Sequence, residues 1–320
     1  MDWTDRRCRA LHRALSKHAL LYTEMVTEGA IHFGDRERLL GFDAVEHPVA
    51  LQLGGSNPER LASAAKIGAD WGYDEINLNV GCPSDRVQEG RFGACLMREP
   101  ALVAECIGAM RAAVSMPVTV KHRLGVDDQD PESTLFSFVE TVAAAGCTTF
   151  IVHARKAWLK GLSPKENRDI PPLDYDIVRR LKAAQPGLTI ILNGGLETLE
   201  QARAETLTLD GAMLGRAAYH DPGILGGVDR LFFGQTTPDV TPAQAIETIR
   251  PMIAADLARG VPLHVWSRHM LGLFRGQSGA RVWRRILGEE GRQRGAGPDV
   301  LDRGLEAIKA SAFEREAEAA

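Results

Sequence analysis

Ile-Asn-Leu-Asn-Val-Gly-Cys-Pro, residues 76–83, is the stretch that decides the fold class of this chain. An apolar strand runs through it until Gly81, and the following turn presents Cys82 ahead of the rigid Pro83. Polar or reactive residues at the end of a buried strand are typically site residues rather than packing residues. A lone cysteine in such a turn is otherwise a small buried thiol. Because six other strands of this chain also end in polar residues, we interpret Cys82 as a site residue.

Short apolar runs alternate with helical periodicity along the first 235 residues. The runs predict strands at 20–25, 49–54, 75–81, 118–123, 149–155, 189–194 and 212–216. The periodicity predicts helices at 7–15, 58–71, 100–114, 132–145, 175–184 and 199–204, with Asn57 as the N-cap of the second. Continuously apolar strands alternating with helices indicate right-handed βαβ units and a parallel sheet.

Seven such strands favour a (β/α)₈ TIM barrel whose first strand is missing from this sequence. Residues 1–5 resemble the loop that would follow that strand, so we expect the strand itself upstream of Met1. A doubly wound open sheet is the alternative, but no glycine-rich turn follows the first predicted strand, where such folds usually carry one.

The composition limits the classes of protein to which this chain can belong. The chain has 320 residues, 44% hydrophobic and 25% charged, which suits a globular protein with one large α/β domain and an appendage. No apolar run approaches the roughly 20 residues that span a bilayer, and the first residues do not read as a secretory signal. Five single cysteines without a CxxC pair argue against a zinc site or a disulfide framework. We therefore expect a cytoplasmic protein with free thiols.

After a proline-bearing linker at 236–241, only helices are predicted, at 242–259, 264–274, 280–289 and 300–320. Net charge over the chain is -4, yet residues 241–297 hold nine Arg against four acids. These arginines interleave with Trp266, Phe274 and Trp283, and Arg beside aromatic residues suits contacts to phosphates and bases. The segment is expected to contact RNA, although a charge run can also be a merely solvated face.

The strand ends carry the candidate chemistry. Asn193-Gly194-Gly195 and Gly215-Arg216 bring bare backbone N–H groups to the last two strands, where barrels bind phosphate. No cluster of three acids or histidines occurs there, so no metal site is expected. Lys121 stands where a barrel aldolase keeps a Schiff-base lysine, and that reading stays open.

Together these positions suit a flavin mononucleotide (FMN). Gln52 can pair with the amide edge of the flavin ring, and Lys121 can lie near the end of the ring that becomes anionic on reduction. His153 is expected to line the flavin or its phosphate. The alternative for Lys121 is a strand-end lysine paired with a nearby acid.

The same residues, in this order, resemble the flavin-dependent tRNA-dihydrouridine synthases, most closely the bacterial A subfamily. The resemblance spans almost the whole chain. Its carrying motifs are LYTEMVTEGA (21–30), EHPVALQLGG (46–55), GYDEINLNVGCPSDRV (72–87), RFGACLM (91–97), VTVKHR (118–123), FIVHARKAWLKGLSPKENRDIPP (150–172), GRAAYH (215–220) and RHMLGLFRGQSGARVWRR (268–285).

The resemblance implies an FMN-binding TIM-barrel catalytic domain over residues 1–235 and a helical tRNA-binding domain over 241–320. The implied reaction is the NADPH-dependent reduction of uridine at positions 20 and 20a of the tRNA D-loop. By the resemblance, Met1 is the remainder of a strand-end motif that holds the flavin. A thiol can act as an acid at neutral pH, so Cys82 would protonate C5 after hydride reaches C6. The expected tRNA contacts are Asn79 on the base and Lys165, Arg168, Arg281 and Arg284 on the backbone.

Two other functions remain possible on the sequence. One is a flavin barrel that reduces a small-molecule enone or pyrimidine, against which the basic helical segment counts. The other is an RNA-binding module without activity, which the missing first strand makes conceivable.

Overall fold

The computed structural model describes residues 3–319, so the predicted flavin contact of Met1 lies outside the described residues. The chain divides into two compact units. The first comprises residues 22–42 and 47–215, and the second comprises 3–21, 43–46 and 216–319. The division that the sequence suggested at 235–241 does not coincide with this boundary, because the helices after Gly215 pack with the N-terminal helix.

The first unit is built on a parallel half-barrel sheet, which confirms the predicted fold class. Its strands run in the order β1-β3-β4-β5-β6-β7-β8, and β2 pairs with β3. Register places Gln52 beside Asn77, Asn77 beside Thr119, and His153 beside Asn193. The strands are β1 (Leu21–Tyr22), β2 (Val26–Thr27), β3 (Val49–Gly54), β4 (Glu75–Val80), β5 (Val118–His122), β6 (Thr149–His153), β7 (Thr189–Asn193) and β8 (Gly211–Met213).

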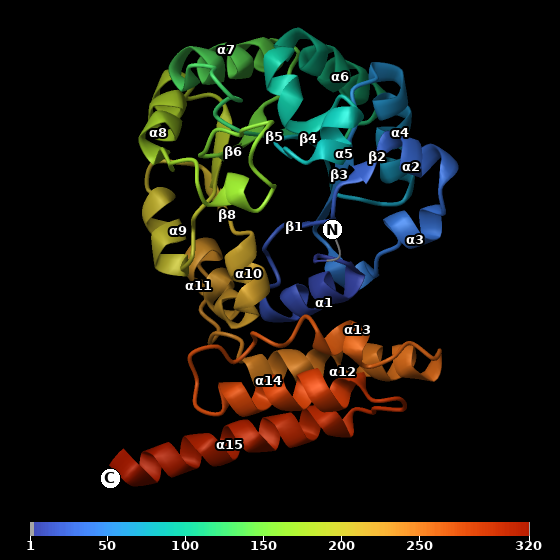
Figure 1. Cartoon of the computed structure of the whole chain (residues 1–320), viewed down its shortest axis with the longest axis vertical. Coiled ribbons are helices and arrows are strands. Elements are labelled where there is room, and N and C mark those ends of the chain that lie inside the picture. Colours follow the sequence, from blue (N-terminus) through green and yellow to red (C-terminus); the bar gives the residue numbers. More distant parts are fainter. Residues whose placement is uncertain (1–2, 320) are drawn as a thin grey trace. The chain divides into compact units, whose positions relative to one another are not determined.

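Helices of the first unit cover the outer face of this sheet (Figure 1). The predicted N-cap is confirmed, since the Asn57 side chain accepts a hydrogen bond from the Arg60 N–H at 2.8 Å. The helices are α2 (Glu28–Phe33), α3 (Arg36–Leu40), α4 (Pro58–Asp70), α5 (Asp85–Glu89), α6 (Pro100–Ala113), α7 (Pro131–Ala144), α8 (Tyr175–Ala184) and α9 (Leu199–Glu205). Among these, α2, α3 and α5 are short helices that the periodicity did not predict.

The strand predicted at 20–25 is interrupted. In its place the structure has β1 and β2, separated by residues 23–25. At the break, the Thr23 hydroxyl accepts the hydrogen bond of the Gln52 N–H at 3.0 Å. A side chain thus takes the place of a backbone acceptor, which ends regular strand pairing at that point.

The second unit is helical. One predicted helix, at 264–274, is wrong in extent, because residues after Ser267 form tight turns whose N–H groups bond three residues back. Gly276 then adopts a left-handed φ of 81°, which a helix does not permit. The helices are α1 (Arg6–Leu15), η1 (Ala44–Glu46), α10 (Arg216–His220), α11 (Val228–Phe233), α12 (Pro242–Ala258), α13 (His264–Ser267), α14 (Ala280–Glu289) and α15 (Asp299–Ala319).

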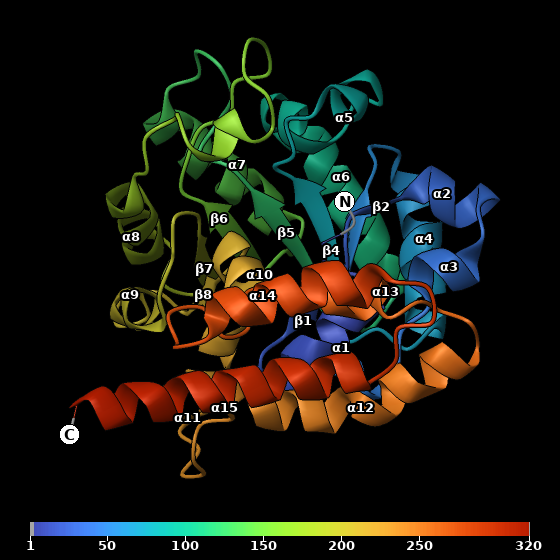
Figure 2. The same ribbon diagram turned by 60° about the horizontal axis from the view of Figure 1, so that its bottom comes forward.

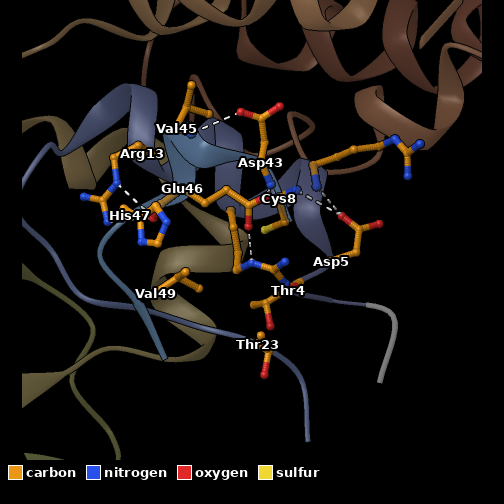
Figure 3. A network of polar contacts seen from close by, with 12 residues as sticks. Thr4, Asp5, Cys8, Arg13, Thr23, Asp43, Val45, Glu46, His47 and Val49 are labelled. Atoms are coloured by element: carbon orange, nitrogen blue, oxygen red, sulfur yellow. Dashed lines mark hydrogen bonds and ion pairs between the residues drawn. The ribbon is translucent and has the colours of Figure 1, made fainter. Parts of the chain in front are cut away.

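A buried polar network holds α1 against η1 within the second unit (Figure 3). Arg9 donates to the Glu46 carboxylate at 2.5 Å, and both side chains are almost fully buried. Arg13 donates to the Glu46 carbonyl and to that of Ser16. Removing one member of such a pair leaves a buried charge without compensation, so the network fixes α1 at its position.

The apolar residues of α1 pack in the same unit, where Leu11 and Leu15 are fully buried. Its first residues bond to the C-terminal helices, with Arg7 donating to Asp256 at 2.7 Å and Asp5 accepting from Arg268 at 2.5 Å. Asp256 also accepts from the Trp266 indole at 2.8 Å. None of the helices over residues 3–319 is long and apolar enough to cross a membrane.

Candidate active site

A chain of hydrogen-bonded side chains crosses the inner surface of the half-barrel. Glu75 accepts from Thr119 at 2.7 Å, and Thr119 accepts from Asn77 at 2.8 Å. Asn77 accepts from Gln52 at 2.9 Å, and Gln52 accepts from Asn79 at 2.8 Å. Every amide in this chain therefore has one defined orientation, with its N–H₂ group directed toward Glu75.

This series of hydrogen-bonded side chains ends at the turn that carries Cys82. The Asn79 side-chain oxygen accepts from the N–H groups of Gly81 at 3.0 Å and Cys82 at 2.9 Å. Gly93 lies against the Cys82 carbonyl, where a Cβ would approach to 2.6 Å. Cys82 itself is half-buried, and its sulfur lies 3.7 Å from the Ser84 hydroxyl. The turn is thus fixed while the thiol stays within reach of solvent.

The Thr119 hydroxyl lies in the middle of this hydrogen-bonded series. Replacing it tests directly whether the series stabilises the fold. Thr119 is 1% exposed, so Thr119→Val keeps the shape but leaves the Asn77 side-chain N–H without its acceptor and Glu75 with only its hydrogen bond from Tyr22. We expect a loss of about 1–3 kcal/mol in the free energy of unfolding. Urea denaturation measures it, with Thr119→Ser, which keeps the hydroxyl, as the control. A valine variant as stable as wild type would show that these hydrogen bonds contribute nothing to the free energy of unfolding.

Basic side chains gather at the ends of β5 and β6. Lys121 donates to the Asn193 side-chain oxygen at 2.8 Å. Arg123, 3% exposed, donates to the carbonyls of Gly81 at 3.1 Å and Asn167 at 2.8 Å. These partners are uncharged, so they leave the positive charge of Lys121 and Arg123 uncompensated.

The pKa values of these basic groups are lowered, mainly by burial and then by the neighbouring positive charge. Desolvation, and then the charge of Arg123, lower the pKa of Lys121 to about 7. Desolvation, with Arg168 and Arg155 nearby, lowers the pKa of Arg123 to about 10. Burial, followed by the same cations, lowers the pKa of His153 well below its usual value. A bound anion would favour the charged forms of these groups and so oppose the shifts, which suits the site to an anion.

Three backbone N–H groups at the ends of β7 and β8 also favour the binding of an anion. Within residues 3–319, the N–H groups of Gly194, Gly195 and Gly215 have no acceptor in the protein. The His153 imidazole likewise has no hydrogen-bond partner in that range, and Gly194 packs on its ring. Unpaired N–H groups beside cations are the usual cradle for a phosphate.

The three glycines have different physical reasons to be glycine. Gly194 and Gly195 have φ of 105° and 70°, and a Cβ on Gly195 would lie 2.4 Å from Leu173. Backbone and packing within the protein therefore require these two glycines. At Gly215 the backbone is unstrained, and a Cβ would meet no atom of residues 3–319 within 4 Å apart from chain neighbours. Nothing in that part of the protein requires glycine there, which leaves space for an external group.

Two of the arginines proposed for RNA, Arg281 and Arg284, lie on the second unit. Arg281 and Arg284 are exposed on α14, and neither has an ion-pair partner among residues 3–319. The expectation that neighbouring aromatic residues contact bases is wrong: Trp266, Phe274 and Trp283 are 2%, 3% and 0% exposed and form the core of the unit. On α14 the helical period explains the interleaving, since Arg281 and Arg284 are exposed while Trp283 lies on the buried face.

The family model described as dihydrouridine synthase (Dus) matches residues 1–312. The chain belongs to the dihydrouridine synthase family. A tRNA-dihydrouridine(20/20a) synthase of Xanthomonas campestris is 56% identical over 94% of this chain and 90% of its own length. That of Vibrio cholerae is 56% identical (96% and 94%), and that of Escherichia coli K12 is 55% identical (96% and 89%). The resemblance seen in the sequence is confirmed.

The structure brings together most of the predicted site residues of the first unit. They are Gln52, Asn79, Cys82, Lys121, His153, Asn193, Gly194, Gly195 and Gly215, all at the carboxyl ends of the strands. Arg216 begins α10 in the second unit, and Lys165 and Arg168 lie in the loop after β6. Within residues 3–319 no group of His, Cys, Asp and Glu could hold a metal ion.

The sequence reasoning missed the residues that support the site. Glu75 and Thr119 anchor the amide chain, and the pattern Glu75-x-Asn77-x-Asn79 was a usable signal. Residues two apart in a strand share a face, so three polar residues at that spacing indicate a polar inner surface. Gln88, which joins the Cys82 turn to the loop after β6, had no such signal.

Proposed function

We propose that this protein reduces uridine to 5,6-dihydrouridine in the D-loop of tRNA, at positions 20 and 20a, with FMN as cofactor and NADPH as reductant. The observation that carries the proposal is the fixed turn of Cys82 beside an anion-binding set of cations and unpaired N–H groups. The names of the relatives support the same reaction.

The residues present fit FMN. The N–H groups of Gly194, Gly195 and Gly215 would hold its phosphate, with Arg216 following Gly215 in the chain. Gln52 keeps one N–H and one lone pair beyond those used in the amide chain, which suits the amide edge of the ring. Lys121 and His153 would face the charge that the ring carries when reduced. Bound there, the reduced flavin supplies hydride to C6 of uracil.

In the proposed reaction, residues of this protein bind and orient the base and donate one proton to it. Asn79 holds its second side-chain N–H for the polar edge of the base, and its orientation is set by Gln52. The Cys82 thiol gives its proton to C5. The thiolate left behind interacts with Lys121 and Arg123, since the Cys82 charge raises the pKa of both. An unpaired D-loop base can leave its stack at small cost to reach the site.

One experiment tests the function as a whole. Purified protein is incubated with NADPH and an unmodified tRNA transcript, and dihydrouridine is located by mass spectrometry of nuclease fragments. We expect the product at positions 20 and 20a and flavin absorbance in the purified protein. Product from free uridine or another small pyrimidine, with none from tRNA, would instead support the small-molecule reductase. Binding of tRNA without product or flavin would support the RNA-binding module.

The exposed arginines of α14 give a separate prediction. If Arg281 and Arg284 contact phosphates, replacing both by alanine lowers the slope of log affinity against log salt by about 0.7–0.9 per contact. tRNA binding at several salt concentrations measures the slope. Arg303→Ala is the control, because its charge is already paired with Glu290 and Asp299. An unchanged slope in the double variant would assign the phosphate contacts elsewhere, with Lys165 and Arg168 as the next candidates.

A further inference from the structure

The loop between β6 and α8 combines positive charge with exposed apolar side chains. Residues 156–168 hold four cations against the single acid Glu166. Trp158 in this loop is 43% exposed, and Ile170 and Leu173 just beyond it are 60% and 37% exposed. The loop rises beyond the carboxyl ends of β5 and β6 (Figure 2). It therefore belongs to the same end of the sheet as Cys82 and Lys121.

The backbone around Trp158 is firmly held. Asn167, fully buried, accepts from the Trp158 N–H at 2.7 Å and donates to the Trp158 carbonyl at 2.9 Å. The next residue, Leu159, donates its N–H to Asp127 at 2.8 Å. The indole is thus exposed on a rigid support, so its exposure does not come from a loose loop.

Gln88 connects this support to the proposed acid. Its side-chain amide donates to the Leu159 carbonyl at 2.8 Å and to the Pro83 carbonyl at 2.9 Å. Pro83 follows Cys82 directly, so one side chain joins the residue after Trp158 to the residue after the cysteine. A group stacked on the indole would be held in a fixed relation to the turn that carries the thiol.

The surroundings of the indole indicate the kind of group. The Lys156 ammonium lies 5.7 Å from the centre of the ring, in cation–π contact with it. Lys160 and Lys165 are exposed in the same loop. A large aromatic surface among cations, with no carboxylate but Glu166 between 156 and 168, suits a flat ring that is attached to phosphates. Nucleic-acid proteins use the same combination for unpaired bases.

We propose that Trp158 is a stacking platform for an unpaired base of the bound tRNA, close to the uridine that reacts, while the lysines of the loop contact the flanking phosphates. The inference rests on the proposed function and adds to it a recognition residue. Stacking holds the neighbouring nucleotide, and the Gln88 connection holds the thiol relative to it. Trp158 is a positioning residue and takes no part in the chemical step.

The experiment compares tRNA binding by W158A, W158F and wild type at several salt concentrations. We expect W158A to bind about 5- to 150-fold more weakly, and W158F to keep most of the affinity because its ring still stacks. Neither should change the salt slope, because stacking releases no counterions, whereas K160A/K165A should lower it. Titration with tRNA should quench tryptophan fluorescence in wild type, and less so in W158F. F33A is the control, since Phe33 is an exposed apolar residue of the same unit, 85% exposed on α2.

The outcomes separate this inference from the function on which it rests. Equal affinity of W158A and wild type, or a loss accompanied by a lower salt slope, would overturn the stacking role. If W158A unfolds, the fluorescence and affinity of W158F still decide it, since normal quenching in W158F would overturn the inference. Failure of wild type to bind tRNA or form dihydrouridine would overturn the proposed function instead.

Discussion

Cys82→Ala is expected to lower dihydrouridine formation by about 10²–10⁴-fold, the usual contribution of a positioned general acid. The turn is held by Asn79 through backbone N–H groups, which alanine retains, so the fold and flavin binding should persist. NADPH oxidation in the absence of tRNA should be unchanged. Single-turnover product formation on a tRNA transcript measures the loss without interference from flavin reduction.

Cys95→Ala is the matched control for that variant. Cys95 is also half-buried and lies in the neighbouring segment of the same unit, but its thiol points to the Phe92 carbonyl at 3.1 Å. We expect activity close to wild type from it. Dihydrouridine formation by Cys82→Ala at the rate of Cys95→Ala would exclude the thiol as the proton donor.

Gly215→Val is expected to give a folded protein that has lost its flavin. Each backbone hydrogen bond to a charged phosphate contributes about 1.5–3 kcal/mol, so displacing the phosphate should weaken FMN binding by about 100-fold or more. The protein itself should tolerate the valine, because a Cβ at Gly215 meets no neighbouring atom within 4 Å in the described part of the chain. The flavin-to-protein absorbance ratio, with the melting temperature of the flavin-free protein, measures both effects.

Gly187→Val provides the comparison. Gly187 is exposed and unobstructed in the same way, but it precedes β7 and so lies at the opposite end of that strand. Its valine variant should keep its colour. If Gly215→Val also purifies yellow with a normal flavin ratio, the phosphate does not lie at Gly215, and the ends of β6 and β7 become the place to search.

Local patterns in the sequence predicted the sheet and most of its helices. Buried parallel strands are apolar on both faces, so β3 to β8 stood out against polar loops, and Asn57-Pro58 marked a helix start. The break at Thr23 was not predictable in this way. It depends on a hydroxyl that meets the Gln52 N–H only once two separate strands are aligned.

The candidate site was predictable where it follows strand ends and not where it depends on contacts. Lys121, His153 and Cys82 could be placed because parallel strands end at one edge. The aromatic residues of the second unit were assigned wrongly. A tryptophan such as Trp283 can lie in a core or on an RNA-binding surface, and only its packing in the folded protein distinguishes these two positions. Gln88 was not predicted, because it donates to the backbone carbonyls of Pro83 and Leu159. Every residue has such a carbonyl, so the sequence gives no sign of these contacts.

The membership of α1 in the second unit has a consequence for synthesis on the ribosome. Arg7 and Asp256 are 249 residues apart in the chain. At synthesis rates of roughly 5–20 residues per second, α1 leaves the ribosome roughly 12 to 50 s before α12 exists. During that time Leu11 and Leu15, both fully buried in the folded protein, have no complete partner surface. The nascent chain therefore exposes the apolar face of α1 until α12 has been made.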